Sequence, residues 1–273
     1  MKEFSETTIP GMYYLKDKVV IITGGSAGLG YDMACTLAEA GCHIIITSRA
    51  AGKSDEAIKK ISSDYGIDAL ALTMDQCQHG QVKEMVHQAL EWKGHIDILI
   101  NNAGGGSGAS EGNFFKRSPE DIVNLITTNL IGALYCCQEV GRIMADQGYG
   151  KIINIGSIAG LVGRDRSMYR RNSKMEQPID YAAAKAGVIG MTRDLASFMA
   201  PYGVCVNCIS PGGFKSGNLP EGFVKSYCDA TALGRMGRMG HDIKGAALFL
   251  ASPASDYVTG HNLVVDGGFS IWK

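Results

Sequence analysis

Short apolar runs alternate with longer stretches of helical pattern along the chain, and this alternation limits the possible folds more than any other feature. The apolar runs predict strands over residues 18–23, 43–47, 69–74, 96–100, 151–155, 204–209 and 261–265. The stretches between them predict helices over residues 28–40, 53–65, 80–92, 118–147, 181–199 and 242–251. Most strand runs are continuously apolar, as expected for strands covered on both faces of a parallel sheet. The sequence therefore predicts an α/β fold with a doubly wound parallel sheet of about seven strands and helices on both faces.

The composition supports a single domain over residues 1–273. Hydrophobic residues make up 45% of the chain, which is enough for a sizeable core. No linker or repeat divides the sequence, and we expect residues 1–14 to form a loose N-terminal arm.

Charge, hydropathy and cysteine content narrow the class of protein. The 26 basic and 27 acidic residues give a net charge of −1, so we expect no nucleic-acid partner. No apolar run approaches the roughly 20 residues that span a bilayer, and the N-terminus is too polar for a signal peptide, so we expect no membrane association. The eight scattered cysteines indicate a reducing, cytoplasmic location. Cys205 and Cys208 fall on a predicted strand, where residues three apart point to opposite faces, and we predict no metal site.

A glycine-rich turn joins the first predicted strand to the first long predicted helix. Gly24, Gly28 and Gly30 would let backbone N–H groups approach a pyrophosphate at the helix N-terminus. An ordinary tight turn would also explain these glycines. The Lys-Ser/Thr pair of a Walker-type phosphate loop does not follow them.

The ends of the second and fourth predicted strands carry further candidate binding residues. The second strand ends at Ser48 and Arg49, where a dinucleotide fold meets the adenosine ribose and an arginine suits a 2′-phosphate. This favours NADP(H), with NAD(H) as the alternative, although a solvated loop arginine would look the same. Asn102, Ala103 and Gly104 follow the fourth strand, where small residues leave room for a ligand.

Tyr181 and Lys185 lie one turn apart on one face of a predicted helix. An ammonium beside a phenol lowers the phenol pKa, so this tyrosine could exchange a proton with a carbonyl or alcohol oxygen. A surface pair would have the same spacing, and the interpretation depends on the whole ordered set of motifs.

That ordered set resembles the short-chain dehydrogenase/reductase family over residues 15–268. Within the family, the pattern is similar to sugar-acid dehydrogenases such as gluconate 5-dehydrogenase. The resemblance implies a catalytic tetrad of Asn129, Ser157, Tyr181 and Lys185. It implies a Rossmann-type cofactor site formed by Gly24, Ser26, Gly28, Leu29, Gly30, Ser48, Arg49, Asp75, Gln76, Asn102, Ala103, Gly104, Tyr181, Lys185, Pro211, Gly212, Phe214 and Ser216.

The resemblance also implies an activity: hydride transfer between a nicotinamide and the carbon of a carbonyl or secondary alcohol. In such an enzyme Tyr181 is the general acid/base and Ser157 hydrogen-bonds the substrate oxygen. Lys185 holds the nicotinamide ribose, and Asn129 anchors a water relay. Family members are commonly homotetramers or homodimers, and residues 118–147 and 269–272 carry apolar side chains that could form interfaces, although burial within one chain would explain them equally well.

Three departures from the family pattern concern the binding site. Gln76 stands where an aliphatic residue is frequent, and residues 213–216 replace a frequent x-Val-x-Thr segment. Residues 158–180 form an insertion between Ser157 and Tyr181, with five basic and three acidic residues. The insertion is either a surface excursion or subunit contact, or an active-site flap whose arginines bind an acidic substrate. The flap hypothesis favours a keto or hydroxy acid, such as a sugar acid.

Several other functions are compatible with parts of this pattern. A non-catalytic NADP(H)-binding sensor or scaffold would not need Tyr181. Epimerases and dehydratases of related fold generally have other glycine spacing, and enoyl reductases place Tyr and Lys further apart. A reductase of a neutral ketone remains the alternative to an acid-specific enzyme.

Overall fold

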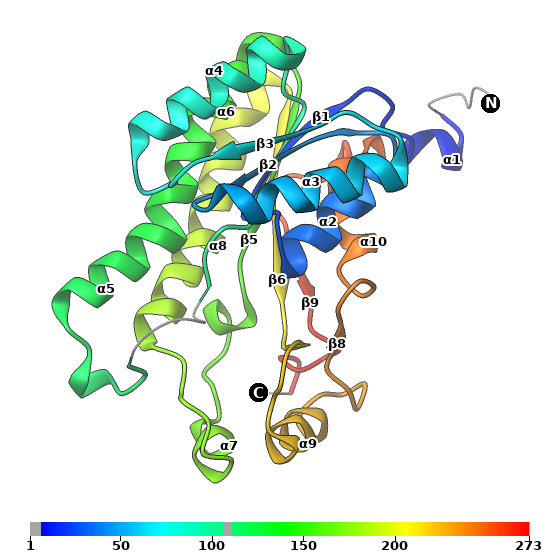
Figure 1. The fold of residues 1–273 in the computed structure, drawn as a ribbon. Coiled ribbons are helices and arrows are strands. Elements are labelled where there is room, and N and C mark those ends of the chain that lie inside the picture. The colour runs from blue at the N-terminus through cyan, green and yellow to red at the C-terminus, as the bar shows by residue number, and fades with distance from the viewer. Residues whose placement is uncertain (1–6, 106–110, 273) are drawn as a thin grey trace.

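The computed structural model describes residues 7–105 and 111–272, and its centre is a parallel sheet of seven strands (Figure 1). The strands are β1 Val19–Thr23, β2 His43–Ser48, β3 Ala69–Thr73, β4 Ile98–Asn101, β5 Gly150–Ile155, β6 Val204–Pro211 and β9 Asn262–Val265. Their order is β3-β2-β1-β4-β5-β6-β9. The predicted doubly wound sheet is therefore confirmed. Strand order reverses between β1 and β4, and such a reversal opens a crevice at the carboxyl ends of the strands.

Helices cover both faces of the sheet (Figure 1). One face packs against α2 Gly28–Glu39, α3 Ala51–Tyr65 and α10 Lys244–Ala251. The other packs against α4 His79–Lys93, α6 Gly132–Gln147 and α8 Ile179–Met199. Along β1, Val20 belongs to the first core and Val19 to the second, because successive strand side chains point to opposite faces.

The single helix predicted over residues 118–147 is interrupted. It comprises α5 Pro119–Ile126, a π-helical turn η2 Thr127–Ile131, and α6. The predicted start is confirmed, since the Ser118 side chain accepts a hydrogen bond from Asp121 N at 3.0 Å. In the π turn, Asn129 donates to Leu125 O and bonds the Gly105 backbone. The bond to Gly105 joins the wider turn to a distant loop, and periodicity alone does not reveal it.

The N-terminal segment contains more structure than a loose arm. Residues 1–6 lie outside the described part, but α1 Ile9–Met12 is a helical turn whose Gly11 N donates to the Thr8 hydroxyl at 3.2 Å. The buried Leu15 donates its N–H to Ala40 O at 2.8 Å. This segment is thus tied to the end of α2.

Several short elements beyond the carboxyl edge of the sheet have no counterpart in the predicted strands and helices. They are η3 Ile158–Gly160, α7 Arg166–Arg171, β7 Phe214–Lys215, α9 Glu221–Asp229 and β8 Gly237–Arg238. The remaining short helices are η1 Phe114–Lys116, η4 Ala200–Tyr202 and η5 Pro253–Ser255. Helices α7 and α9 lie side by side below the sheet (Figure 1), with the Tyr169 and Phe223 ring centroids 5.1 Å apart.

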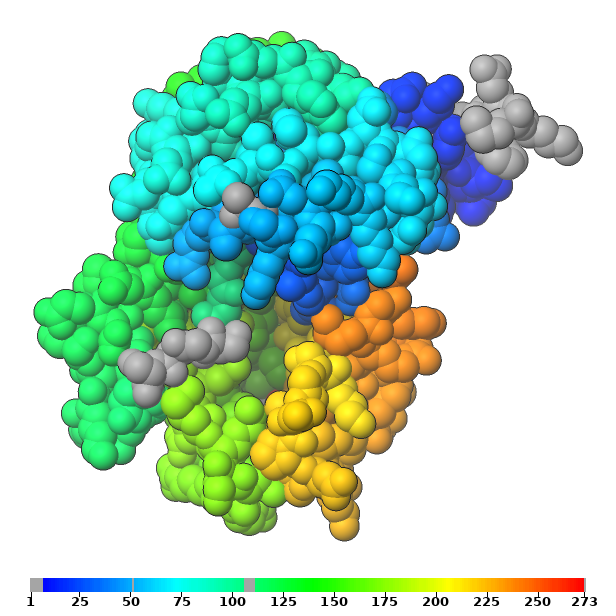
Figure 2. Space-filling view, in the orientation of Figure 1, coloured from blue at the N-terminus to red at the C-terminus, as the bar shows by residue number. Residues whose placement is uncertain are grey.

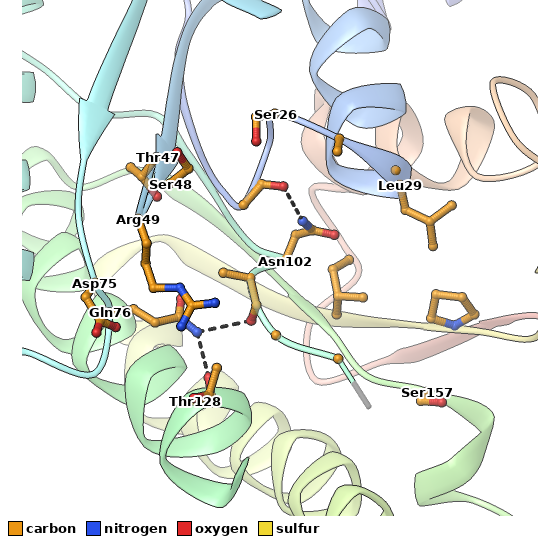
Figure 3. A pocket seen from close by; sticks show the side chains of 18 of the residues that line it. Ser26, Leu29, Thr47, Ser48, Arg49, Asp75, Gln76, Asn102, Thr128 and Ser157 are labelled. Carbon is orange, nitrogen blue, oxygen red and sulfur yellow. Dashed lines mark hydrogen bonds between the residues drawn. The ribbon is translucent and has the colours of Figure 1, made fainter. Parts of the chain in front are cut away.

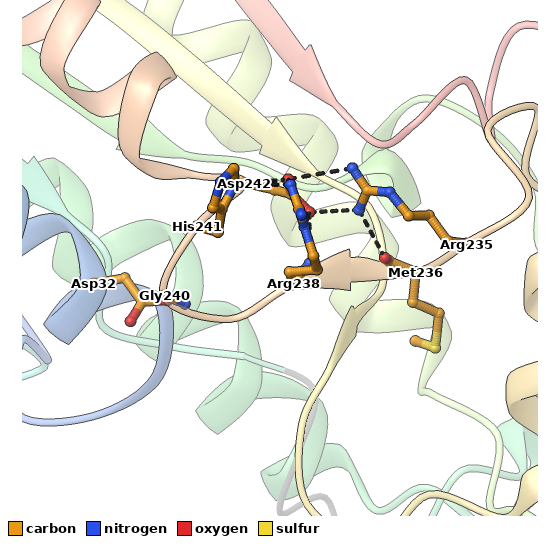
Figure 4. Close-up of polar contacts among 7 residues, drawn as sticks. All are labelled: Asp32, Arg235, Met236, Arg238, Gly240, His241 and Asp242. Carbon is orange, nitrogen blue, oxygen red and sulfur yellow. Dashed lines mark hydrogen bonds and ion pairs between the residues drawn. The ribbon is translucent and has the colours of Figure 1, made fainter.

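An ion cluster shapes the loop before α10 (Figure 4). Asp242 pairs with Arg235 and Arg238, and these guanidinium groups hold the pKa of its carboxyl well below its usual range. Because Asp242 is used in this cluster, α10 begins at Lys244 rather than at the predicted residue 242. Gly240 N donates to Asp32 Oδ2 on α2 at 2.6 Å, which fixes the loop against the helix that follows the glycine-rich turn. Among residues 7–105 and 111–272, no helix combines the length and hydrophobicity needed to cross a bilayer.

Candidate active site

Two cavities meet at the carboxyl edge of the sheet. The first has a volume of about 760 Å³ and the second about 400 Å³, and Ser157, Tyr181 and Gly212 line both. Figure 2 shows this face hollowed between the blue and cyan N-terminal part and the yellow-green and gold segments that contain α7 and α9. A ligand in one cavity can therefore reach a ligand in the other beside Ser157 and Tyr181.

Most of the predicted cofactor residues line the first cavity (Figure 3). They are Gly24, Ser26, Gly28, Leu29, Ser48, Arg49, Asp75, Gln76, Asn102, Ala103, Gly104, Tyr181, Lys185, Pro211 and Gly212. Phe214 and Ser216 line the second cavity instead, because the chain turns away after Gly212 into β7. Gly30 does not line either cavity and lies behind the turn, against Asn102.

The glycine-rich turn is locked to the loop after β4. Asn102 Nδ2 donates to the carbonyl oxygens of Thr23 and Gly24, each at 3.0 Å. A Cβ on Gly30 would lie 2.4 Å from that same nitrogen, so only glycine allows this close approach. Helix α2 starts after Ala27 without a side-chain cap, which leaves N–H groups of its first turn available for an anion. These features fit a dinucleotide whose pyrophosphate lies over the turn.

The far end of the first cavity is basic. Arg49 and Lys53 both line it, whereas the Ser48 hydroxyl is already bonded to Ala50 O and to the Ser54 hydroxyl. Sequence reasoning missed Lys53. The available signal was its place just after Arg49, in the first turn of the next helix, where a second cation faces the same ligand.

Gln76 connects two loops of the first cavity, which gives its departure from the family pattern a structural role. Its Nε2 donates to Ala103 O at 3.1 Å and to Thr128 O at 2.6 Å (Figure 3). Asp75 is likewise engaged, since its carboxylate accepts from Cys77 N at 3.0 Å.

Three of the four predicted catalytic residues line the first cavity and come from two elements. Ser157 follows β5, and its Oγ accepts from Ala159 N at 3.1 Å. Tyr181 and Lys185 lie on α8, and the buried Lys185 donates from Nζ to Ile155 O at 2.7 Å. This bond ties the lysine to the end of the strand that presents Ser157.

Asn129 is the fourth predicted catalytic residue and lies behind the wall. Its side chain is buried in the π turn. Oδ1 accepts from Gly105 N at 2.7 Å, and Nδ2 donates to Leu125 O at 3.0 Å. A Cβ on Gly104 would lie 2.6 Å from Asn129 Oδ1, so the asparagine fixes the backbone of the loop that follows β4.

Burial controls the ionisation of the two α8 residues. It raises the pKa of Tyr181, and the Ser157 hydroxyl and the Arg164 guanidinium oppose this shift. It lowers the pKa of Lys185 to about 8. The prediction that Lys185 lowers the Tyr181 pKa is therefore not confirmed in this structure. Lys185 Nζ lies 5.8 Å from the Tyr181 ring centroid, and the nearby cation that acts on the phenol is Arg164.

The second cavity has a mainly apolar wall. Its side chains come from the insertion, from α9 and from the C-terminus, and include Met168, Tyr169, Phe223, Tyr227, Met236 and Phe269. Tyr227 and Phe269 stack with centroids 4.6 Å apart. Phe269, one of the apolar residues considered for an interface, is buried in this wall. Sequence reasoning considered Met168 and Tyr169 only as apolar cover of the insertion and did not bring them together with α9, because these segments meet only when they fold over the sheet edge.

The two residues of the C-x-x-C pair differ in environment. On β6, Cys208 is buried and Cys205 is partly exposed, and both are free thiols. Among residues 7–105 and 111–272, no group of three His, Cys, Asp or Glu side chains is arranged to hold a metal ion.

Comparisons with known proteins agree with this geometry. A family model described as enoyl-(acyl carrier protein) reductase matches residues 24–270. The chain is 36% identical to 2-dehydro-3-deoxy-D-gluconate 5-dehydrogenase of Dickeya dadantii, over 94% of this chain and 97% of that one. It is 34% identical to cyclohexanol dehydrogenase of a Rhodococcus species, again over 94% and 97%.

A solved structure shares the fold over nearly the full length. NADPH-dependent 3-quinuclidinone reductase from Rhodotorula rubra superposes with a TM-score of 0.87 and 29% identity, over 99% of this chain and 98% of that one. Relatives and fold together show that the chain belongs to the short-chain dehydrogenase/reductase family and is an oxidoreductase acting on CH–OH donors.

Proposed function

We propose that this protein is an NADP(H)-dependent enzyme that interconverts a carbonyl and a secondary alcohol, with Tyr181 as general acid and base. The observation that carries the proposal is that Ser157 and Tyr181 line both cavities. A dinucleotide in the larger cavity and a substrate in the smaller one would meet at these two side chains.

The bound nicotinamide supplies or accepts the hydride, and the chain manages the substrate oxygen. Tyr181 donates its phenolic proton to the carbonyl oxygen in reduction and takes it back in oxidation. Burial, which raises its pKa, keeps the phenol protonated near neutral pH. Ser157 Oγ accepts from Ala159 N, which leaves its hydroxyl as a donor; this hydroxyl also acts on the Tyr181 phenol, and it would bond a substrate oxygen placed beside both groups.

Lys185 and Asn129 have supporting roles in this proposal. Lys185 Nζ donates one hydrogen bond to Ile155 O, and an ammonium has two further donors, which would hold the nicotinamide ribose. Asn129 fixes the Gly105 backbone and would anchor the water relay through the π turn.

The preference for NADP(H) rests on the basic end of the first cavity. Arg49 and Lys53 line it together, and two cations suit the 2′-phosphate better than the bare hydroxyl of NAD(H). The NADPH-dependent reductase of similar fold supports the same choice.

We propose a keto or hydroxy acid as the substrate, such as a sugar acid. The 2-dehydro-3-deoxy-D-gluconate 5-dehydrogenase relative supports this class, as does Arg164 in the second cavity. A neutral ketone or alcohol is the second candidate, favoured by the methionine and aromatic wall of that cavity and by the cyclohexanol dehydrogenase relative.

A nicotinamide absorbance assay tests the proposed function. Wild-type protein is offered a panel of keto acids, their methyl esters and simple ketones, each with NADPH and with NADH. We expect turnover of an acid with kcat/KM about ten- to hundredfold higher for NADPH, the range that a charged hydrogen bond provides. Equal or better kcat/KM with NADH would reject the cofactor proposal. Turnover of the neutral compounds alone would select the second candidate.

We propose that the enzyme is a cytoplasmic homotetramer or homodimer. Exposed apolar side chains support assembly: Val123 on α5 and Phe198 on α8 are 61% and 66% exposed, and Trp272 is 59% exposed. Eight free thiols suit a reducing compartment. Light scattering at several protein concentrations tests the assembly.

A further inference from the structure

Three of the five basic residues of the insertion are paired with carboxylates of the same segment, whereas Arg164 and Lys174 line the second cavity. Arg166 Nη1 lies 2.6 Å from Glu176 Oε2, and Arg170 Nε lies 2.8 Å from the other oxygen of the same carboxylate. Arg171 Nη2 lies 3.9 Å from Asp165 Oδ2, and the Arg171 side chain is 66% exposed. These three arginines hold α7 to the rest of the insertion and do not line the second cavity.

Arg164 differs from them in its position and its partners. It lines the second cavity, and its guanidinium carbon lies 5.5 Å from the Tyr181 ring centroid. Nη1 donates to Gln177 O at 3.2 Å, which fixes the guanidinium between the two ends of the insertion. Burial lowers the Arg164 pKa, and the neighbouring Tyr169, Tyr181 and Arg166 modify this shift. Asp165 and Lys174 line the same cavity, but Asp165 pairs with Arg171 and Lys174 lies over the Phe223 ring.

One end of the Arg164 guanidinium lacks a partner. Nη2 is buried, and within residues 7–105 and 111–272 it makes no hydrogen bond. A buried charged donor without an acceptor is unfavourable, so an acceptor from outside the chain would be stabilised there. Arg164 lines the second cavity, whose wall also contains apolar side chains such as Met168 and Phe223.

We propose that Arg164 is the residue that binds a carboxylate of the substrate, and that this carboxylate is carried on a largely apolar body, which within the proposed class of keto and hydroxy acids favours an aryl or alkyl acid over a sugar acid. The inference rests on the proposed function, because the cavity receives a substrate only if carbonyl chemistry occurs at Tyr181. It narrows the flap hypothesis from several arginines to one. A carboxylate held beside Tyr181 would align the reacting carbonyl with the phenol through binding energy from a remote group.

A binding experiment tests Arg164 independently of turnover. The enzyme saturated with NADPH is titrated with benzoate and with benzamide, which share size and shape but differ in charge. We expect benzoate to bind about ten- to hundredfold more tightly. Arg164→Met should remove this difference, Arg164→Lys should retain part of it, and Arg171→Met is the matched control that should retain all of it. Equal affinity for the two probes in the wild-type enzyme would overturn the proposal.

A turnover experiment separates substrate binding from an effect on Tyr181. The ratio of kcat/KM for benzoylformate to that for its methyl ester should fall about ten- to hundredfold in Arg164→Met. An equal loss of kcat/KM for acid and ester, with a displaced pH profile, would show that Arg164 acts on the Tyr181 phenol and not on a substrate carboxylate. This result would overturn the proposal. Thermal unfolding confirms that each variant is folded. If neither compound nor any other carbonyl is reduced, the proposed function fails, while the benzoate titration still decides the role of Arg164.

Discussion

Arg117 and Asp180 form a buried ion pair directly before the proposed general acid. Arg117 Nη2 lies 2.6 Å from Asp180 Oδ2, and the two side chains are 2% and 6% exposed. Asp180 is in the first turn of α8 and precedes Tyr181, while Arg117 lies just before α5. The pair therefore fixes the start of the helix that carries Tyr181 and Lys185.

Replacing one partner of this pair should destabilise the protein strongly. In Arg117→Met the Asp180 carboxylate is left buried without its cation, which costs about 3–5 kcal/mol in the free energy of unfolding. Urea denaturation measures the change. Arg142→Met is the matched control, because Arg142 is 63% exposed and lies 3.7 Å from Glu139; it should cost at most about 1 kcal/mol. Similar losses in the two variants would contradict the stabilising role of the buried pair.

Sequence patterns predicted the parts of the molecule that depend on local order. The seven central strands follow from apolar runs, most of them continuous, and most of the predicted cofactor residues follow from motifs at strand ends and from the family resemblance. The Arg117–Asp180 pair joins residues 63 positions apart, and no periodicity signals such a contact. The π turn at Asn129 and the second-cavity wall around Phe223 also depend on tertiary contacts. Tertiary structure alone distinguishes Arg164 from Arg166 and Arg170, because Glu176 pairs with those two arginines.

The close approach of Gly30 to Asn102 predicts a severe effect from one methyl group. In Gly30→Ala the new Cβ would lie 2.4 Å from Asn102 Nδ2 and 2.6 Å from Gly24 O. The turn must shift, so we expect a loss of about 1–3 kcal/mol in the free energy of unfolding and weaker NADPH binding. Thermal unfolding and fluorescence titration measure the two effects. Gly190→Ala is the control in open space on α8 and should be neutral or stabilising by up to about 1 kcal/mol.

The two cations at the end of the first cavity should set cofactor choice. Arg49→Ala and Lys53→Ala should each raise KM for NADPH about tenfold, the lower limit of a lost charged hydrogen bond, with little change for NADH. Lys60→Ala, on the same helix and outside the cavity lining, is the control. If Lys53→Ala left the NADPH-to-NADH ratio of kcat/KM unchanged, Lys53 would have no part in binding the 2′-phosphate.

Lys185 should give cofactor-free protein an alkaline rise in stability. Burial lowers its pKa from 10.5 to about 8, so between these values the unfolded chain binds more protons than the folded one, and stability increases with pH. Below pH 8 the buried ammonium lowers the free energy of unfolding by about 3 kcal/mol, because one pKa unit corresponds to about 1.36 kcal/mol. This penalty should be relieved as pH rises to about 10.5.

The comparison of wild type with Lys185→Met isolates this contribution. Buried thiols that do not interact with Lys185, such as Cys136 and Cys137, have pKa values raised by burial; they act in the opposite direction in both proteins and cancel in the difference. Urea denaturation should therefore show that the free energy of unfolding of wild type, relative to that of Lys185→Met, is higher at pH 10 than at pH 7. A constant difference between the two proteins would show that the lysine pKa is unshifted.

Removing the Tyr181 hydroxyl should stop chemistry without emptying the cofactor site. Tyr181→Phe keeps the aromatic ring, whose centroid lies 5.5 Å from the Arg164 guanidinium carbon and 5.8 Å from Lys185 Nζ. It removes only the hydroxyl group that carries the transferable proton. General acid–base catalysis contributes roughly 10²–10⁴-fold, so kcat should fall by that factor while the dissociation constant for NADPH changes little. Steady-state kinetics measures kcat, and an equilibrium titration measures the dissociation constant on the same preparation.

Tyr169→Phe is the matched control. Tyr169 is a phenol of the second cavity, and burial also raises its pKa, but it does not line the first cavity. It should cost far less in kcat. A loss of similar size in both variants would mean that the proton donor is not specific to Tyr181, and near-normal turnover of Tyr181→Phe would assign the proton to another group.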